Sequence, residues 1–301
     1  MKLTTNEMSG LLGKPAPLIA SPPLPKERLK QRRCGREVGR ANELKCMKAV
    51  ASFGHLRIAE LARCVWPSAR FAEQLGRRTV RRLVLQGLLL ERRNALGSTS
   101  LCVTRAGAAW LDLRGIAAKH TLELSSVSGA TFFHRTLASR YLIERQATGS
   151  QVAGEYLILR RALPFSIDRI TQALQKQPDG LVWQRRGDGG PMPVEFVEQE
   201  AAPKARAEIE RCLKAAEYVG AQLSGDDAYV LSGLVFVYDR SLNHARRILL
   251  AATALWSSRS ATERATLERR VKLVAVELRE PLVWVSSSVT TLHDLRMRGG
   301  A

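Results

Sequence analysis

The stretch from Phe71 to Thr104 constrains the fold of this chain more than any other, because it reads as a helix followed by two short strands. The helix is predicted from apolar residues such as Val80 and Leu83, which recur on one side with the helical period. Gly87 is expected to end it. The roughly opposite side of this helix carries four arginines: Arg77, Arg78, Arg81 and Arg82.

A small β-hairpin is expected directly after this helix. Two short runs rich in apolar residues, 88–93 and 100–103, surround the polar turn 94–99, and the first run ends in Arg92 and Arg93. Three more helices are predicted around this unit, two before it and one after it: Glu43–Phe53 with Asn42 as its N-cap, Ile58–Trp66, and a helix capped by Thr104 that runs to about Leu113.

Three helices and a hairpin within about 65 residues have the size and order of a winged helix-turn-helix domain. In such a domain the third helix enters the DNA major groove and the hairpin lies along the backbone. We therefore predict double-stranded DNA as the partner, and the contacting side chains as Arg70, Arg77, Arg78, Arg81, Arg82, Arg92 and Arg93. The simpler alternative is that these arginines form only a solvated helix face.

The charge of the chain is concentrated at its N-terminal end. The net charge is +19, of which residues 1–41 carry +6, residues 42–114 carry +8 and residues 115–301 only +5. Arginine outnumbers lysine 36 to 11, and arginine favours planar contacts to phosphates and base edges. A polyanion is therefore expected to bind the N-terminal part.

Cysteine usage and hydropathy favour a protein of a reducing cytoplasm. The five cysteines are scattered and include no C-x-x-C pair, which argues against a zinc site or a disulfide framework. Prolines interrupt the weak apolar run near the N-terminus, so we expect no signal peptide. The longest apolar run, Ile248–Trp256, is too short to span a bilayer, and no membrane partner is expected.

Helices and strands alternate from Thr131 onward, which predicts an α/β domain with a mixed sheet flanked by helices. The strands are expected at Glu155–Arg160, Leu181–Arg185, Val194–Gln199, Tyr229–Tyr238, Val271–Leu278 and Leu282–Val285. The helices are expected at Phe132–Gln146, Ile167–Gln177 (or an insertion there), Lys204–Leu223 with Pro203 at its start, Leu242–Trp256 and Ala261–Arg270. The domain boundaries are then a proline-rich, disordered basic arm (1–41), the winged helix (42–114), a Gly/Ser-rich linker (115–130), the α/β domain (131–286) and a poorly ordered tail (287–301).

Carboxylates are expected to gather at one end of a hairpin in this second domain. Asp179 opens one predicted strand, and Glu195, Glu198 and Glu200 lie on the next. If the turn between them is centred near Asp188–Gly189, facing residues sum to about 377, which places Asp179 opposite Glu198. Glu198 and Glu200 share a strand face. Such carboxylates suit Mg²⁺, with Asp179 and Glu198 as candidate ligands.

The pair Pro178-Asp179 at a strand start, with an acidic residue near the end of the next strand, resembles the PD-(D/E)xK nuclease superfamily. This resemblance implies a Mg²⁺-dependent endodeoxyribonuclease, whose catalytic candidates here are Asp179, Glu198, Glu200 and Lys204. The chain departs from the pattern, because Glu200 stands where the family has its lysine, and Lys204 follows on the next helix. The departure favours a degenerate domain that does not cleave DNA and needs no cofactor.

A second resemblance covers both domains. Its motifs, in order, are V-T-R-A-G (Val103–Gly107), His134, Pro178-Asp179-Gly180, V-E-x-E (Val197–Glu200), Lys214 and Tyr218. Together they resemble the plasmid replication-relaxation family of bacterial mobile elements. This implies a cytoplasmic, nucleoid- or plasmid-associated DNA-binding accessory protein, active in replication, mobilisation or transcriptional control, with replication or conjugation proteins as further partners.

The sequence is therefore compatible with three functions. The first is a DNA-binding accessory protein, and the second is a metal-dependent endonuclease that loses activity in Asp179→Ala. The third is a protein-interaction adaptor in a transfer or replication complex, which would bind a protein partner and have little affinity for DNA. The sequence contains no heptad repeat of apolar residues, so it does not predict an oligomeric state.

Overall fold

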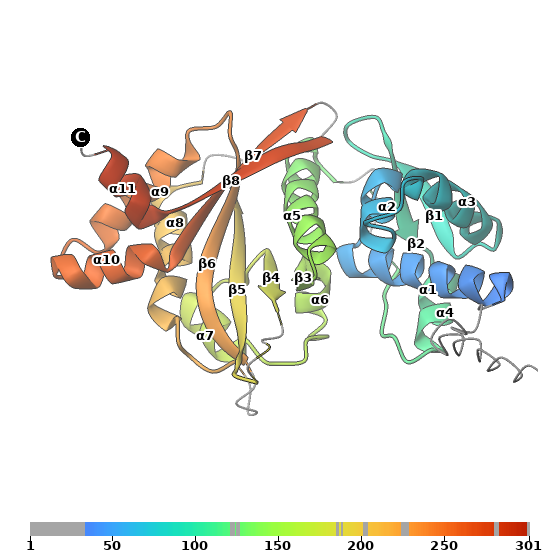
Figure 1. The fold of residues 1–301 in the computed structure, drawn as a ribbon, viewed down its shortest axis with the longest axis horizontal. Helices are drawn as coiled ribbons and strands as arrows, with labels where there is room; N and C mark the ends of the chain where they lie inside the picture. Colours follow the sequence, from blue (N-terminus) through green and yellow to red (C-terminus); the bar gives the residue numbers. More distant parts are fainter. Residues whose placement is uncertain are drawn as a thin grey trace, which may run out of the picture. The chain divides into compact units, whose positions relative to one another are not determined.

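The computed structural model describes residues 34–120, 124, 127–184, 187, 189–200, 204–223, 229–279 and 283–299. Within these ranges the protein is a mixed α/β structure with a two-stranded sheet and a six-stranded mixed sheet (Figure 1). Most of the predicted basic arm, together with Pro203 and Arg185, lies outside the described residues.

The N-terminal elements follow the predicted order of helices and hairpin. They are α1 (Gly35–Phe53), α2 (Ile58–Val65), α3 (Ala72–Leu85), β1 (Leu89–Arg93), β2 (Thr99–Val103) and α4 (Arg105–Asp112). Helix α3 buries Val80 and Leu83, as its periodicity predicted, and Gly87 follows it with a φ of 69°. The predicted cap of α4 is confirmed, because Thr104 Oγ1 accepts a hydrogen bond of 2.9 Å from the Gly107 N–H.

Helix α1 is longer than expected. It begins at Gly35, so the prediction that Asn42 caps it is wrong, as is the prediction that the disordered arm extends to residue 41. The side chain of Glu37 accepts a hydrogen bond of 3.2 Å from the Cys34 N–H and thereby caps the first turn. No proline follows residue 25 before this helix, so nothing in residues 35–41 interrupts its hydrogen bonding.

The side chain of Asn94 organises the turn of the N-terminal hairpin. Its Oδ1 accepts hydrogen bonds from the N–H groups of Leu96 (3.0 Å) and Ser98 (3.2 Å), and its Nδ2 donates to Ser100 Oγ (3.0 Å). Strands β1 and β2 are antiparallel, and Leu56 forms an isolated antiparallel bridge with Leu101 of β2. The segment between α1 and α2 thus adds a short third partner to the hairpin.

The large sheet has the strand order β3-β4-β5-β6-β7-β8. Its strands are β3 (Gln151–Gly154), β4 (Gly180–Trp183), β5 (Met192–Glu200), β6 (Tyr229–Asp239), β7 (Val271–Arg279) and β8 (Val283–Thr291). The central pairs β5–β6 and β6–β7 are parallel, and the other pairs are antiparallel. The predicted mixed sheet is therefore confirmed.

Helices cover both faces of this sheet. They are α5 (Gly129–Ala147), α6 (Glu155–Leu159), α7 (Asp168–Leu174), α8 (Arg206–Leu213), the 3₁₀ helix η3 (Lys214–Tyr218), α9 (His244–Leu255), α10 (Ala261–Arg269) and α11 (Leu292–Gly299). Leu137 of α5 packs in one core with Val182 and Val197, whereas Ile209 of α8 and Ile248 of α9 pack in another. This two-sided burial explains why strands β4 and β6 are almost entirely apolar.

Two of the elements predicted for the chain after residue 130 are wrong. The expected strand Glu155–Arg160 is helix α6, and the strand lies just before it, at Gln151–Gly154. An apolar run as short as Tyr156–Leu159 fits a strand or a helix equally well, and here Gly154 ends the extended segment as the N-cap of α6. The expected long helix Lys204–Leu223 is split, because η3 replaces its second half and Gln222 bridges to Val230.

The prediction of a poorly ordered C-terminal tail is also wrong, because residues 286–299 form a strand and a helix. Strand β8 pairs with β7 up to Thr291, and α11 follows directly. Thr291 caps that helix, since its Oγ1 accepts a hydrogen bond of 3.1 Å from the Asp294 N–H. Among the described residues, no helix combines the length and apolar character that a membrane span requires.

Candidate functional site

The hairpin β4–β5 brings the predicted carboxylates together. Gly180 pairs with Val197 and Leu181 with Phe196, so facing residues sum to 377 and the predicted register is confirmed. Asp179 directly precedes β4, and its Oδ2 accepts a hydrogen bond of 2.8 Å from the N–H of Gln199. Asp179 therefore lies at the end of β5 that carries Glu198 and Glu200.

Asp179 is held as a carboxylate by a histidine from helix α5. Its Oδ1 lies 3.3 Å from Nε2 of His134. Burial opposes ionisation, but the hydrogen bond and charge of His134, helped by Lys176 and Lys204, lower the pKa of Asp179 to about 2. The motif order had singled out His134, but only the packing of α5 on the sheet places it beside Asp179.

Glu198 is a buried acid of this cluster that is paired with a lysine. The ammonium of Lys176 contacts its Oε2, and the thiol of Cys212 donates to the same oxygen at 3.4 Å. Burial and the nearby Asp179 raise the pKa of Glu198 to about 7, although Lys176 opposes this shift. Lys176 was missed at the sequence level, and its only signal is its position three residues before Asp179.

Glu200 pairs with the lysine that the sequence had proposed as a substitute catalytic group. Lys204 Nζ lies 2.9 Å from Glu200 Oε1 and donates to the carbonyl of Gln199 at 2.9 Å. Burial raises the pKa of Glu200, and Lys204 opposes the shift. Lys204 is thus directed at Glu200 and the backbone of β5.

Glu195, the remaining acid of strand β5, does not belong to this cluster. It lies near the middle of the strand, where Lys272 Nζ contacts its Oε1 at 2.5 Å and Arg145 Nη1 approaches its Oε2 at 3.3 Å. Glu195 is therefore part of a separate ion-pair network across the sheet.

The carboxylates of this cluster, paired as they are in the structure, are not available to bind a divalent cation. Each of its three carboxylates already has a basic partner: His134 for Asp179, Lys176 for Glu198 and Lys204 for Glu200. The described residues contain no group of three or more His, Cys, Asp or Glu side chains placed to hold a metal ion. Mg²⁺ would have to displace a lysine from a buried carboxylate in order to bind there.

Space beside Asp179 is also limited. The cavity next to it, lined by His134, Ser139 and Tyr156 among others, has a volume of about 20 Å³. That is room for about one water molecule. A nucleotide does not fit into this cavity without rearrangement of its walls.

The arginines of α3 are all exposed, but they differ in their partners. Arg82 Nε lies 3.0 Å from Glu43 of α1, and Arg77 lies 3.6 Å from Glu73 on the same helix. Arg78 and Arg81 have no ion pair within the described part of the chain. These two side chains are therefore the ones most available to an anionic ligand.

The other predicted DNA-contacting arginines lie on either side of α3. Arg70 is exposed just before the helix, with its guanidinium carbon 5.2 Å from the centre of the Phe71 ring. Arg92 and Arg93 lie on β1, where Arg92 is half-buried and the exposed Arg93 donates to the Gly97 carbonyl at 3.3 Å. The structure thus places a basic residue on each of the elements expected to face DNA.

Comparisons with protein-family models, with curated proteins and with solved structures find no match to this chain.

Proposed function

We propose that the chain is a double-stranded DNA-binding accessory protein whose helices α1–α3 and hairpin β1–β2 act as a winged helix-turn-helix domain. The observation that carries this proposal is the exposed arginine face of α3, which lies opposite a buried apolar face and precedes a hairpin with further arginines. Helix α3 would enter the major groove, and the hairpin would lie along a phosphate backbone.

Charge supports a nucleic acid over other ligands. Residues 42–114 carry +8, and their acidic partners neutralise only part of the α3 arginines, since Arg78 and Arg81 have no ion pair within the described residues. Arginine side chains on a helix read guanine by two parallel hydrogen bonds and bind phosphates in the same way. The motif order that resembles the replication-relaxation family supports a role at a plasmid or mobile element in the bacterial cytoplasm.

Arg78 and Arg81 give the sharpest test of DNA binding. We expect the double variant Arg78→Ala/Arg81→Ala to bind duplex DNA at least tenfold more weakly, because a good arginine contact contributes about 1–3 kcal/mol. The slope of log K against log salt should fall by about 2, one for each lost phosphate contact. Fluorescence anisotropy with a labelled duplex over a salt series measures both quantities.

The matched control removes two exposed arginines elsewhere. Arg246 on α9 and Arg298 on α11 are exposed, and their double alanine variant has the same net charge as the test variant. An equal loss of DNA affinity in the two variants would mean that binding depends only on net charge. Unchanged DNA affinity in the α3 variant would disprove the assignment of α3 as the DNA-contacting helix. An adaptor protein would show little DNA affinity in the wild type.

We further propose that the α/β domain is a nuclease-like domain that does not cleave DNA. The supporting observation is that all three carboxylates of the cluster are paired with basic side chains, and that Lys204 is directed at Glu200. The competing proposal, a Mg²⁺-dependent endonuclease, is favoured by the convergence of Asp179, Glu198 and Lys204 at one strand end.

One incubation series separates these two proposals. Supercoiled plasmid is mixed with the wild type or with Asp179→Ala, in EDTA, Mg²⁺ or Mn²⁺, and run on gels before and after removal of protein. We expect a retarded band without nicking under every condition and for both proteins. Metal-dependent nicking by the wild type that is absent in Asp179→Ala would make the protein an endonuclease.

A further inference from the structure

Strand β8 is a long and uncharged edge of the six-stranded sheet. It is last in the strand order and spans nine residues, Val283–Thr291, none of which is charged. Three of its valines remain well exposed: Val283 (51%), Val285 (39%) and Val289 (64%). An edge strand presents a row of backbone N–H and C=O groups that can pair with another strand.

The two edges of the sheet differ in how they are protected. Strand β3 at the other edge has four residues and leads directly into helix α6, so it offers little length for pairing. Natural edge strands are commonly blunted by short length, lysine, proline or inward charges, and β8 has none of these features. Its one irregularity is a register shift opposite Glu277 and Leu278, which leaves Ser286–Thr291 regularly paired to β7.

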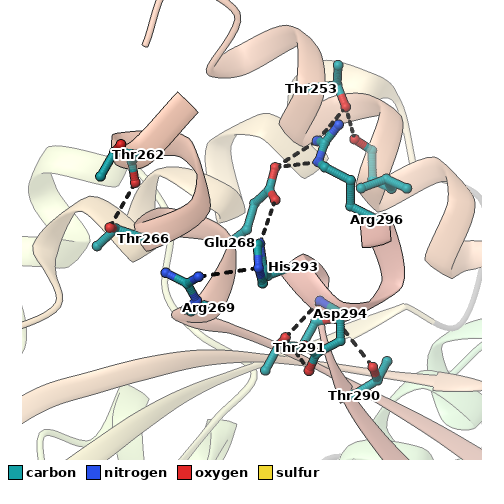
Figure 2. Close-up of polar contacts among 11 residues, drawn as sticks. Thr253, Thr262, Thr266, Glu268, Arg269, Thr290, Thr291, His293, Asp294 and Arg296 are labelled. Carbon is teal, nitrogen blue, oxygen red and sulfur yellow. Dashed lines mark hydrogen bonds and ion pairs between the residues drawn. The ribbon is translucent and has the colours of Figure 1, made fainter. Parts of the chain in front are cut away.

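The C-terminal end of β8 is held in place by the helix that follows it. Figure 2 shows Thr291 and Asp294 joined at this junction, with Thr291 Oγ1 2.7 Å from Asp294 Oδ2. Further along α11, Arg296 binds the buried Glu268 of α10 at 2.7 Å and donates to Thr253 Oγ1 of α9 at 2.8 Å (Figure 2). The helix that follows the edge strand is therefore fixed to α10 by an ion pair, and the strand would pair without a large ordering cost.

We propose that β8 is a dimerisation strand, which pairs antiparallel with β8 of a second copy and extends the sheet across a two-fold axis. Pairing along the whole strand places the axis at Ser287. Val289 then lies opposite Val285 of the second copy, so these two exposed valines gain an apolar neighbour, and Val283 faces Thr291. A self-complementary contact of this kind is the usual form of a two-fold interface.

The side chains of β8 favour a second copy over a charged partner strand. The chain carries +19, but β8 itself brings no charged side chain into the contact, so the repulsion between two copies is weakest there. The order of side chains is symmetric about Ser287, with serine on both sides of it and then valine on both sides. An acidic or basic peptide would find no complementary charge along this strand.

The mass of the protein in solution tests the proposal. Light scattering after size exclusion, on nuclease-treated protein without DNA and in high salt, is expected to give twice the mass of one chain. Val289→Lys should return the protein to one chain's mass, because the two lysines lie close to the axis and Val289 is too exposed to be needed for folding. Met297→Lys on α11 is the matched control, with the same added charge at a site 66% exposed, and should stay dimeric.

Cysteine cross-linking tests the arrangement of the strands. In a background with the exposed Cys34 changed to Ser, Ser287→Cys should form a disulfide-linked dimer on mild oxidation, because residue 287 faces itself across the axis. Val283→Cys should not, since the two copies of residue 283 would lie about 26 Å apart. A monomeric wild type, or cross-linking through residue 283 in preference to 287, would overturn the proposal. These readouts contain no DNA, so they stand or fall separately from DNA binding.

Discussion

The variant Lys176→Met is expected to lower the free energy of unfolding by about 3 kcal/mol or more near neutral to mildly alkaline pH. Lys176 contacts the carboxylate of Glu198, which is only 4% exposed. Methionine keeps most of the volume of lysine but removes its charge, so Glu198 is left as a buried acid without a cationic partner. Urea denaturation, followed by circular dichroism, measures the difference.

The size of this loss should depend on pH in a defined direction. The pKa of Glu198 is raised from 4.5 to about 7 in the folded protein, so the folded state holds this proton where the unfolded state has released it. Stability contributed by the group is therefore present below about pH 4.5 and is lost as pH rises towards 7. Without Lys176 the pKa rises further, and the deficit of the variant grows with pH. Asp179, with its pKa lowered to about 2, does not titrate in this range.

A double-mutant cycle controls for simple loss of packing. Glu198→Gln removes the charge that Lys176 neutralises, so Lys176→Met/Glu198→Gln should be more stable than Lys176→Met alone at about pH 8. Lys48→Met, at an exposed position of α1, should leave stability unchanged within about 0.5 kcal/mol. If Lys176→Met were as stable as Lys48→Met at every pH, the ion pair between Lys176 and Glu198 would not contribute to the stability of the fold.

The second large effect is expected at Gly107, in the first turn of α4. A Cβ atom built there would lie 2.1 Å from the carbonyl oxygen of Leu88 and 2.9 Å from Cε of Met47. The Leu88 carbonyl also accepts a 3.2 Å hydrogen bond from the Thr104 N–H, so it is not free to move away. We expect Gly107→Ala to destabilise the protein by about 3 kcal/mol through forced displacement of this backbone.

The matched control for Gly107→Ala is Gly129→Ala, at the first residue of α5. A Cβ at Gly129 meets nothing within 4 Å, so alanine there should be neutral or stabilise the protein by up to about 1 kcal/mol. Thermal unfolding of the three proteins, followed by circular dichroism, compares them directly. A Gly107→Ala variant as stable as the wild type would show that α4 does not pack against Leu88 as described.

Local chemistry accounts for the elements that could be predicted from the sequence. The period of α3 fixed which side faces the core, because Val80 and Leu83 recur at helical spacing and the arginines do not. The register of β4 on β5 followed from the position of the glycine-rich turn, which is why Asp179 and Glu198 could be placed together. Both features depend on residues close to one another along the chain.

Other features were decided by the tertiary structure alone. The run Glu155–Arg160 suits a strand as well as a helix, and its packing after β3 selects the helix. Residues 286–291 are mostly serine and threonine and were predicted to form a tail, but pairing with β7 makes them a strand. His134 and Lys176 come from separate elements, and only the packing around the β4–β5 end brings them to Asp179 and Glu198. Periodicity and turn chemistry act over a few residues, whereas the pairing of each buried carboxylate depends on contacts between distant segments, which no local pattern encodes.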